Sequence, residues 1–185
     1  MATMKVFVDD ELIKEEEVFS AENWDEIPDK VKENIFSKHG DICTDYEWWE
    51  FIYEDAKNVG LKIGSFDLGG ASYVKGDFLL SANEVAPNII NEHGDICETH
   101  KTAQNFLDEW TPVFADYLDE NSENYESYDA ERKLQDLEDE FLKSLCEDYR
   151  IILQKEYEFL TSEESVVETF KANEYVFDKW GNIVS

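Results

Sequence analysis

The residues of this chain that are chemically best suited to bind a metal ion are its three histidines and three cysteines. Four of them belong to a pentapeptide, His-Gly-Asp-Ile-Cys, that occurs at residues 39–43 and again at residues 93–97. Two imidazoles and two thiolates form one of the ligand sets that zinc accepts in a tetrahedral site. The candidate zinc ligands are therefore His39, Cys43, His93 and Cys97, with His100 in reserve.

The repeat also fits two similar helix endings. The match between the copies extends upstream to residues 31–43 and 85–97, where 8 of 13 positions agree. Both stretches place an apolar pair about one turn before the glycine, and a glycine just past a helix end commonly adopts a left-handed conformation. Zinc ligands this close in sequence are more often two cysteines, and each His–Cys pair here straddles the expected helix end. We therefore favour helix endings at Gly40 and Gly94, keep zinc as the alternative, and predict no cofactor.

No other pattern in the chain predicts an enzyme. The sequence lacks a Gly-x-x-x-x-Gly-Lys phosphate loop, a Gly-x-Ser-x-Gly turn and a His-Glu-x-x-His helix. With 45 acidic residues, neighbouring carboxylates arise by number alone and do not indicate acid–base catalysis. Gly69-Gly70 fits a hairpin turn, and Cys97 with His100 lacks the flanking signature of a cysteine nucleophile. We predict no catalytic residues.

The net charge is the dominant feature of the sequence. Its 45 acidic and 16 basic residues give a formal net charge of -29. A net charge of about 2 to 8 in magnitude already keeps a small domain soluble. Because phosphates are bound by Lys and Arg, the charge excludes direct binding to nucleic acid or to an anionic membrane surface. It favours a basic partner, such as a nucleic-acid-binding protein; the alternative is that the charge serves solubility alone.

The densest acidic stretch is residues 116–148, where 13 acidic residues face Arg132, Lys133 and Lys143. Residues 116–129 are polar without apolar periodicity, which indicates a linker, and the following segment has the apolar spacing of a long helix. Since duplex DNA carries one charge per about 1.7 Å of its axis, carboxylates on a rigid element can imitate a phosphate backbone. The predicted partner-binding acids are Asp116, Asp119, Glu120, Glu123, Glu126, Asp129, Asp136, Glu140 and Glu147.

Two adjacent tryptophans, Trp48 and Trp49, lie among glutamates in a predicted helix. Adjacent helix residues point about 100° apart, so one ring can be less buried than the other. An exposed aromatic side chain surrounded by charged residues is typical of the centre of a protein-binding surface. We therefore add Trp48 and Trp49 to the predicted partner-binding residues, with a place in the core as the alternative.

The apolar pattern predicts an α+β fold in which helices pack with small antiparallel hairpins and one long helix lies in the C-terminal half. Strands are expected over residues 4–8, 11–19, 61–80 (as a hairpin) and 174–184. Helices are expected from Asn23 to Gly40, and over 46–60, 81–93, 99–118, 130–160 and 161–173. Pro112 should kink or interrupt its helix.

The same pattern predicts how the chain divides into domains. Residues 1–118 are expected to form an α+β core domain, followed by an acidic linker over residues 119–129. Residues 130–185 then supply the long helix, a short helix and a terminal hairpin that pack on the core. Ser81 with Glu84, and Thr161 with Glu164, match the capping-box pattern at the start of a helix.

The sequence also predicts a cytoplasmic protein. Its N-terminus has no apolar signal-peptide region, and no stretch approaches the ~20 apolar residues that span a bilayer. Three cysteines, an odd number, fit a reducing cytosol better than a disulfide framework.

Three stretches carry a resemblance to a known family: YEWWEFIYEDAKNVGLKIGSFDL (46–68), YVKGDFLLSANEVAPNIINEHGDICETHKTAQNFL (73–107) and EYEFLTSEE (156–164). Over about residues 44–178 the chain resembles a family of small phage and prophage proteins commonly labelled antitoxin of a toxin–antitoxin stability system. The resemblance implies phage carriage and the cytosol of a bacterial host. It implies no activity and no site residues.

The charge and this setting together predict a non-enzymatic phage protein that inhibits a basic host or defence protein, acting as a DNA mimic. One alternative is an antitoxin-like partner of a cognate basic toxin. Another is a small-ligand or metal-binding protein built around the His–Cys pairs and the hairpin over residues 61–80.

Overall fold

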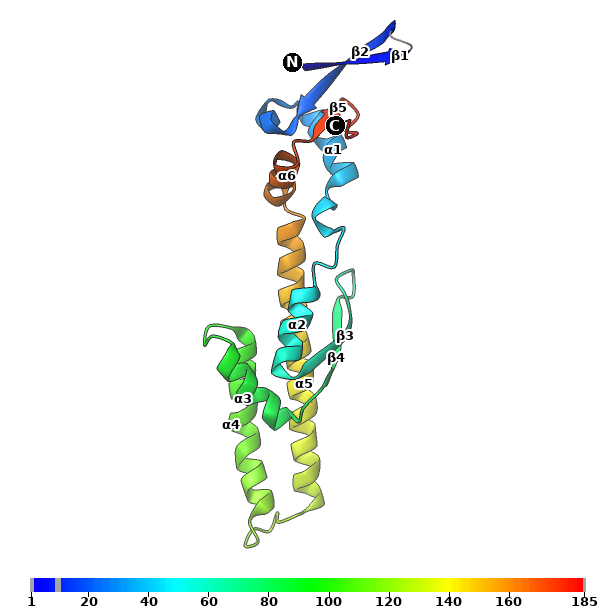
Figure 1. Ribbon diagram of the computed structural model, residues 1–185. Coiled ribbons are helices and arrows are strands. Elements are labelled where there is room, and N and C mark those ends of the chain that lie inside the picture. The colour runs from blue at the N-terminus through cyan, green and yellow to red at the C-terminus, as the bar shows by residue number, and fades with distance from the viewer. Residues whose placement is uncertain (1, 9–10, 185) are drawn as a thin grey trace. The chain divides into compact units, whose positions relative to one another are not determined.

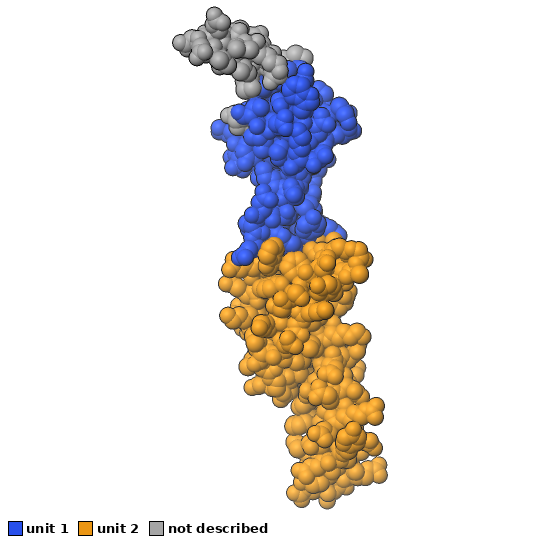
Figure 2. Space-filling view, turned by 90° about the vertical axis from the view of Figure 1, so that its right-hand side faces the viewer, with its two compact units in different colours: residues 1–48, 156–185 blue, residues 49–155 orange. Residues whose placement is uncertain are grey.

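The computed structural model describes residues 2–8 and 11–184 and confirms the predicted α+β class (Figure 1). The chain forms two compact units, which Figure 2 colours separately. Unit 1 comprises residues up to 48 together with residues from 156 on, and unit 2 comprises residues 49–155. The sequence pattern places boundaries at residues 118 and 130 instead, because composition marks a polar linker but does not show which segments pack together.

Unit 1 is discontinuous because its sheet joins both ends of the chain. Within the described ranges the strand order is β1–β2–β5, all antiparallel. The strands β1 (Ala2–Val8) and β2 (Glu11–Ser20) form the predicted N-terminal hairpin. The short strand β5 (Val176–Asp178) lies along the other edge of β2, with Phe177 opposite Phe19. Local sequence patterns do not predict the pairing of β2 with β5, because these strands lie far apart in the chain.

Two helices and an aromatic cluster complete unit 1. Helices α1 (Asp29–His39) and α6 (Glu163–Ala172) pack with the 3-10 helix η1 (Ala21–Glu26). At their centre Phe170 and Phe177 are fully buried, with ring centroids 5.1 Å apart. Trp24 of η1 adds a third ring, 5.9 Å from Phe170.

Two predicted helix starts in unit 1 are wrong. The first helix begins at Asp29, after Pro28, and Asn23 lies inside η1. Proline suits the start of a helix because it lacks the N–H that an interior position needs. The last helix is capped by Ser162, whose side chain accepts a hydrogen bond from the Ser165 N–H, and not by Thr161.

Unit 2 begins with a helix and the predicted hairpin. Helix α2 (Glu50–Val59) starts four residues later than expected. It follows the 3-10 helix η2 (Ile42–Thr44), which belongs to unit 1. Gly60 ends α2 with φ 98°, the left-handed conformation that is common for a glycine at a helix end. Strands β3 (Leu61–Asp67) and β4 (Tyr73–Phe78) then pair antiparallel.

The rest of unit 2 is helical. Helix α3 (Ala82–Glu92) opens with the predicted capping box of Ser81 and Glu84. Helix α4 (Glu98–Leu118) starts one residue before its predicted start at residue 99 and runs through Pro112 without interruption. Helix α5 (Tyr128–Leu160) returns alongside α4 (Figure 1), and Phe106 stacks on Phe141 with ring centroids 4.3 Å apart. Within the described residues, no helix combines the length and apolar character that crossing a membrane requires.

Candidate functional site

Each copy of the pentapeptide lies at the end of a helix, as predicted, but neither of its glycines is left-handed, so that part of the prediction is wrong. Gly40 has φ -65° and ψ -14°, a right-handed conformation. Helix α3 ends at Glu92, and His93 is already extended, with φ -100° and ψ 140°. Among the described glycines, only Gly60 and Gly181 have positive φ. The second copy leads from the end of α3 to the start of α4 at Glu98, and its backbone is extended at His93. It therefore does not form the left-handed turn that would close the end of α3.

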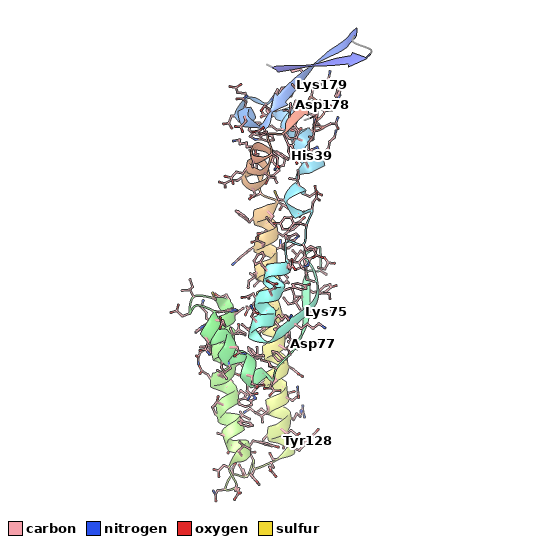
Figure 3. All side chains as sticks on the ribbon, viewed as in Figure 1. His39, Lys75, Asp77, Tyr128, Asp178 and Lys179 are labelled. Carbon is pink, nitrogen blue, oxygen red and sulfur yellow. The ribbon has the colours of Figure 1, made fainter. Side chains whose placement is uncertain are left out.

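The first copy of the pentapeptide makes contacts within unit 1 that hold two distant parts of the chain together. The His39 Nε2 atom donates a hydrogen bond to the carbonyl of Gly181 at 3.0 Å (Figure 3 labels His39). Cys43 is buried, and its Sγ lies 3.1 Å from the Oγ1 of Thr169. Both side chains therefore connect the end of α1 and η2 to the C-terminal part of unit 1.

The second copy takes part in a different arrangement, in unit 2. The Nδ1 atom of His93 lies 2.7 Å from Thr99 Oγ1, and its Nε2 atom lies 3.3 Å from Asp55 Oδ1. On the other oxygen of Asp55, the Tyr149 hydroxyl donates a hydrogen bond at 2.8 Å. His100 donates from Nδ1 to the His93 carbonyl at 3.0 Å. Three helices thus contribute to one polar cluster around a histidine whose side chain is 10% exposed.

Zinc has no support from this geometry. His39 and Cys43 belong to unit 1, whereas His93 and Cys97 belong to unit 2. In the part of the chain that the structure describes, no group of three His, Cys, Asp or Glu side chains is arranged to hold a metal ion.

The polar cluster sets the ionisation of its members. Hydrogen bonding to His93 lowers the pKa of Asp55, burial opposes that shift, and the Tyr149 hydrogen bond adds to it. Burial raises the pKa of Tyr149 far above its ordinary value, and the Asp55 carboxylate beside it acts in the same direction. At neutral pH, Asp55 is therefore ionised, and it accepts a hydrogen bond from the neutral hydroxyl of Tyr149.

A pocket of about 480 Å³ opens beside this cluster, entirely within unit 2. We call it the α3–α4 pocket, because residues of the turn between these helices line it, together with residues of α5. Its lining carboxylates are Asp55, Glu92, Glu98 and Asp148, and its lining lysine is Lys155. Sequence reasoning singled out His93 and Cys97 but missed these carboxylates, since they come from helices far apart in the chain.

Asp148 is the least favourably placed of these carboxylates. It is half-buried on α5, where the Thr102 hydroxyl donates to it at 2.7 Å. Burial raises the pKa of Asp148, the Thr102 hydrogen bond partly opposes this, and the charges of Glu98 and Glu147 raise it further. The folded state therefore disfavours the ionised form.

Replacing Asp148 by Asn should stabilise the protein at pH 7. A carboxyl group whose pKa is raised on folding lowers stability where it is ionised, and this cost disappears as the pH falls toward the ordinary aspartate range, about 4. The gain is expected to stay below about 1 kcal/mol, because the group keeps contact with solvent. Urea denaturation at pH 7 and pH 4 measures it. Asp136→Asn, on an exposed residue of the same helix, should show no gain, and an equal gain there would contradict the prediction.

The acidic surface has its own geometry at the end of the α4–α5 pair. We call residues 116–129 the hairpin end; it holds six carboxylates and no Lys or Arg. All six side chains are exposed: Asp116, Asp119, Glu120, Glu123, Glu126 and Asp129. The hairpin end consists of the last turn of α4, the loop over residues 119–127 and the first residues of α5. This loop is longer than the roughly 2 to 8 residues that commonly join packed helices.

Internal hydrogen bonds hold the hairpin end in shape. Asp116 accepts hydrogen bonds from the Ser122 hydroxyl at 2.5 Å and from the Asn124 side-chain amide at 2.6 Å. These two bonds, the first foremost, lower the pKa of Asp116. Glu126 has φ 45°, and its N–H donates to the Tyr117 carbonyl at 2.9 Å. The loop is thus closed on itself, with its remaining carboxylates facing solvent.

Farther along α5 the predicted acids are paired. Asp136 lies 3.9 Å from Arg132, Glu140 lies 3.6 Å from Lys143, and Glu147 lies 2.6 Å from Arg150. Exposed pairs of this kind contribute little to stability, but each one reduces the local negative charge. Of the predicted acids, those farther along α5 are therefore partly neutralised by neighbouring cations, whereas at the hairpin end the nearby positive charge that acts is that of Lys133 on Asp116.

The two predicted tryptophans differ in burial. Trp48 is 6% exposed and packs on Tyr157, with ring centroids 5.8 Å apart. Trp49 is half-buried and packs on Phe66 at 5.7 Å. The exposed aromatics of the hairpin end are Tyr125 and Tyr128, 40% and 76% exposed, and Figure 3 labels Tyr128. Sequence reasoning had passed over both, although tyrosine among acids in a polar loop is an available sign of a contact surface.

Comparison with models of protein families, with curated proteins and with solved structures found no match, so the family resemblance of the sequence stays a prediction.

Proposed function

We propose that this protein is a non-enzymatic inhibitor that binds a basic, nucleic-acid-binding protein through the hairpin end. The observation that carries the proposal is the set of six exposed carboxylates, without a Lys or Arg among them, on the loop and the two adjoining helix ends, which hydrogen bonds within the hairpin end hold in shape. The setting we propose is the cytoplasm of a bacterial host, with the target a host or defence protein.

The physical basis is electrostatic preorganisation. A net charge of -29 steers a basic protein toward this one over distances of about a Debye length, roughly 10 Å at 0.1 M salt. Binding then requires little ordering of the loop, because Asp116 and Glu126 already fix its path. Exposed carboxylates on such a scaffold occupy the place that phosphates take in the partner's usual ligand.

The exposed tyrosines at the hairpin end add a contribution that charge alone does not make. Tyr125 and Tyr128 present large, rather rigid surfaces beside the carboxylates. Aromatic residues are enriched at the centres of protein interfaces, whereas charges at the rim mainly set the association rate. The combination favours a specific protein partner over diffuse attraction of any polycation.

A capture experiment tests the proposal. The tagged protein is immobilised, bacterial lysate is passed over it, and bound proteins are released in parallel by salt, by duplex DNA and by polyglutamate at equal charge concentration. We expect DNA to release a nucleic-acid-binding protein at lower concentration than polyglutamate does, because both ligands then compete for one surface. Release by DNA no better than by polyglutamate would contradict DNA mimicry. A small basic protein that ignores DNA would instead favour an antitoxin-like role.

A further inference from the structure

We infer that the partner of the hairpin end is a protein that binds single-stranded nucleic acid, and that Tyr125 and Tyr128 occupy the places of two bases of that strand. The inference rests on the proposed function and deepens it, because it names the class of basic protein that the hairpin end meets.

The second half of the hairpin end presents acids and aromatic rings in alternation. In chain order these residues are Glu123, Tyr125, Glu126, Tyr128 and Asp129, and all five side chains are exposed. No Lys or Arg interrupts the series. A single strand of nucleic acid has the same two components, since each nucleotide carries a charged phosphate and an aromatic base. The series therefore offers a partner both parts of such a ligand.

The exposed rings distinguish a single strand from a duplex. In a duplex the base faces stack on one another, and proteins read only the base edges from the grooves. A single strand exposes its base faces, which proteins bind by stacking them on aromatic side chains. Tyr128 is 76% exposed and Tyr125 is 40% exposed, and neither stacks on another aromatic ring of the described residues. Free aromatic faces beside carboxylates thus imitate the unpaired strand and not the duplex.

The backbone fixes both rings. The N–H of Tyr125 donates to the Ser122 carbonyl at 3.2 Å. Tyr128 is the first residue of α5 (Figure 3), where the Glu131 N–H donates to the Ser127 carbonyl at 3.0 Å. Because three residues of chain span at most about 11 Å, the two rings can reach one partner surface. Little ordering of the chain then opposes binding.

The chemistry of the partner follows from these groups. Proteins that bind single strands combine a positively charged groove, which follows the phosphates, with aromatic side chains on which successive bases stack. The carboxylates of the hairpin end complement the charge of such a groove, and the two tyrosine rings complement its aromatic side chains. A duplex-binding protein complements the carboxylates alone.

The first test compares competitors for the partner captured by the full-length protein. These are oligo(dT) and oligo(U) of about 20 nucleotides, which exceed the site of one single-strand-binding domain, the oligo(dT)–oligo(dA) duplex, and polyglutamate, all at equal charge concentration. We expect a single strand to release the partner at about tenfold lower concentration than the duplex, because only the single strand replaces the rings as well as the charges. The duplex should still act before polyglutamate, through its phosphates. The better of the two single strands shows whether the partner binds DNA or RNA.

The outcomes separate this inference from the proposed function. Release by the duplex at the same or a lower concentration than by both single strands overturns the inference and leaves the proposed function standing. Release by polyglutamate as good as by any nucleic acid contradicts the proposed function, and the inference with it. Capture of no basic protein has the same meaning.

The second test removes the rings without changing the charge. Tyr125→Leu combined with Tyr128→Leu should weaken binding of the partner about thirtyfold, the lower end of what two stacked rings contribute. The slope of log Kd against log salt concentration should stay that of the parent, since no ion exchange is lost. Tyr125→Phe combined with Tyr128→Phe keeps both ring faces and should bind within about threefold of the parent.

The matched control is Tyr46→Leu combined with Tyr73→Leu, which removes two exposed tyrosine rings outside the hairpin end. It should change the affinity by no more than about twofold, because residues away from the interface contribute little to binding. The inference is overturned if the leucine pair at the hairpin end binds as tightly as the parent. It is also overturned if the phenylalanine pair or the control loses as much affinity as that leucine pair.

Discussion

Replacing Asp119, Glu120, Glu123 and Glu126 by their amides is expected to weaken binding of the basic partner by about a hundredfold at low salt. Each exposed charge contributes at most about 1 kcal/mol, and four acting together on one surface account for such a loss. The amides keep the acceptor oxygens, so Asp119→Asn can still accept the hydrogen bond from the Asn121 N–H. The loop should therefore keep its shape while it loses its charge.

The measurement is the dissociation constant of the captured partner as a function of salt concentration. In the parent protein its logarithm should rise steeply with the logarithm of salt concentration, and in the variant the slope should be shallower, because fewer ions are exchanged on binding. A low-salt affinity that falls while the slope stays unchanged would point to a structural effect and not to lost charge.

The matched control neutralises one aspartate and three glutamates in unit 1. Asp25, Glu26, Glu47 and Glu168 are exposed, and their amides remove the same total charge. We expect this variant to lose at most about threefold in affinity, since its charges act only through the long-range field. Equal losses in the two variants would show that the total charge, and not the hairpin end, is what the partner recognises.

Gly181→Ala is expected to destabilise unit 1 by about 2 to 4 kcal/mol, the largest effect of a single substitution that we predict. Gly181 has φ +80°, and an added Cβ would lie 2.6 Å from the backbone of Asn34 and Ile35 in α1. Its carbonyl also accepts the hydrogen bond from His39. The substitution thus combines a strained backbone with a clash against a helix that cannot move without disturbing the buried core around Ile35.

Thermal unfolding followed by circular dichroism measures this effect. For a chain of this size, 2 to 4 kcal/mol corresponds to a fall in the melting midpoint of roughly 5 to 15 °C. Gly94→Ala is the control, since an added Cβ there meets nothing within 4 Å and the backbone has no positive φ. We expect Gly94→Ala to change the midpoint by no more than about 2 °C. A large loss at Gly94 would instead restore the interpretation of the pentapeptide as a left-handed helix ending.

Structural features that depend only on residues close together in the sequence could be predicted from it. The capping box of Ser81 and Glu84 and the end of α2 at Gly60 are determined by residues within one turn, and the structure confirms both. The hairpin of β3 and β4 follows from strand-forming residues around a glycine turn, and it too is confirmed. The exposure of the acids at the hairpin end follows in the same way, because a charged, polar loop has nothing to bury.

The sequence by itself thus determined the α+β class, most helices and hairpins, and the place where negative charge concentrates. Only the tertiary structure decided what the two identical pentapeptides do. His39 bonds to the carbonyl of Gly181, whereas His93 lies between Thr99 and Asp55 beside a pocket. Five identical residues cannot encode that difference, because each copy takes its role from segments far away in the chain. For the same reason, local sequence patterns did not predict that β5 pairs with β2 or that Asp55, Asp148 and Lys155 line one pocket.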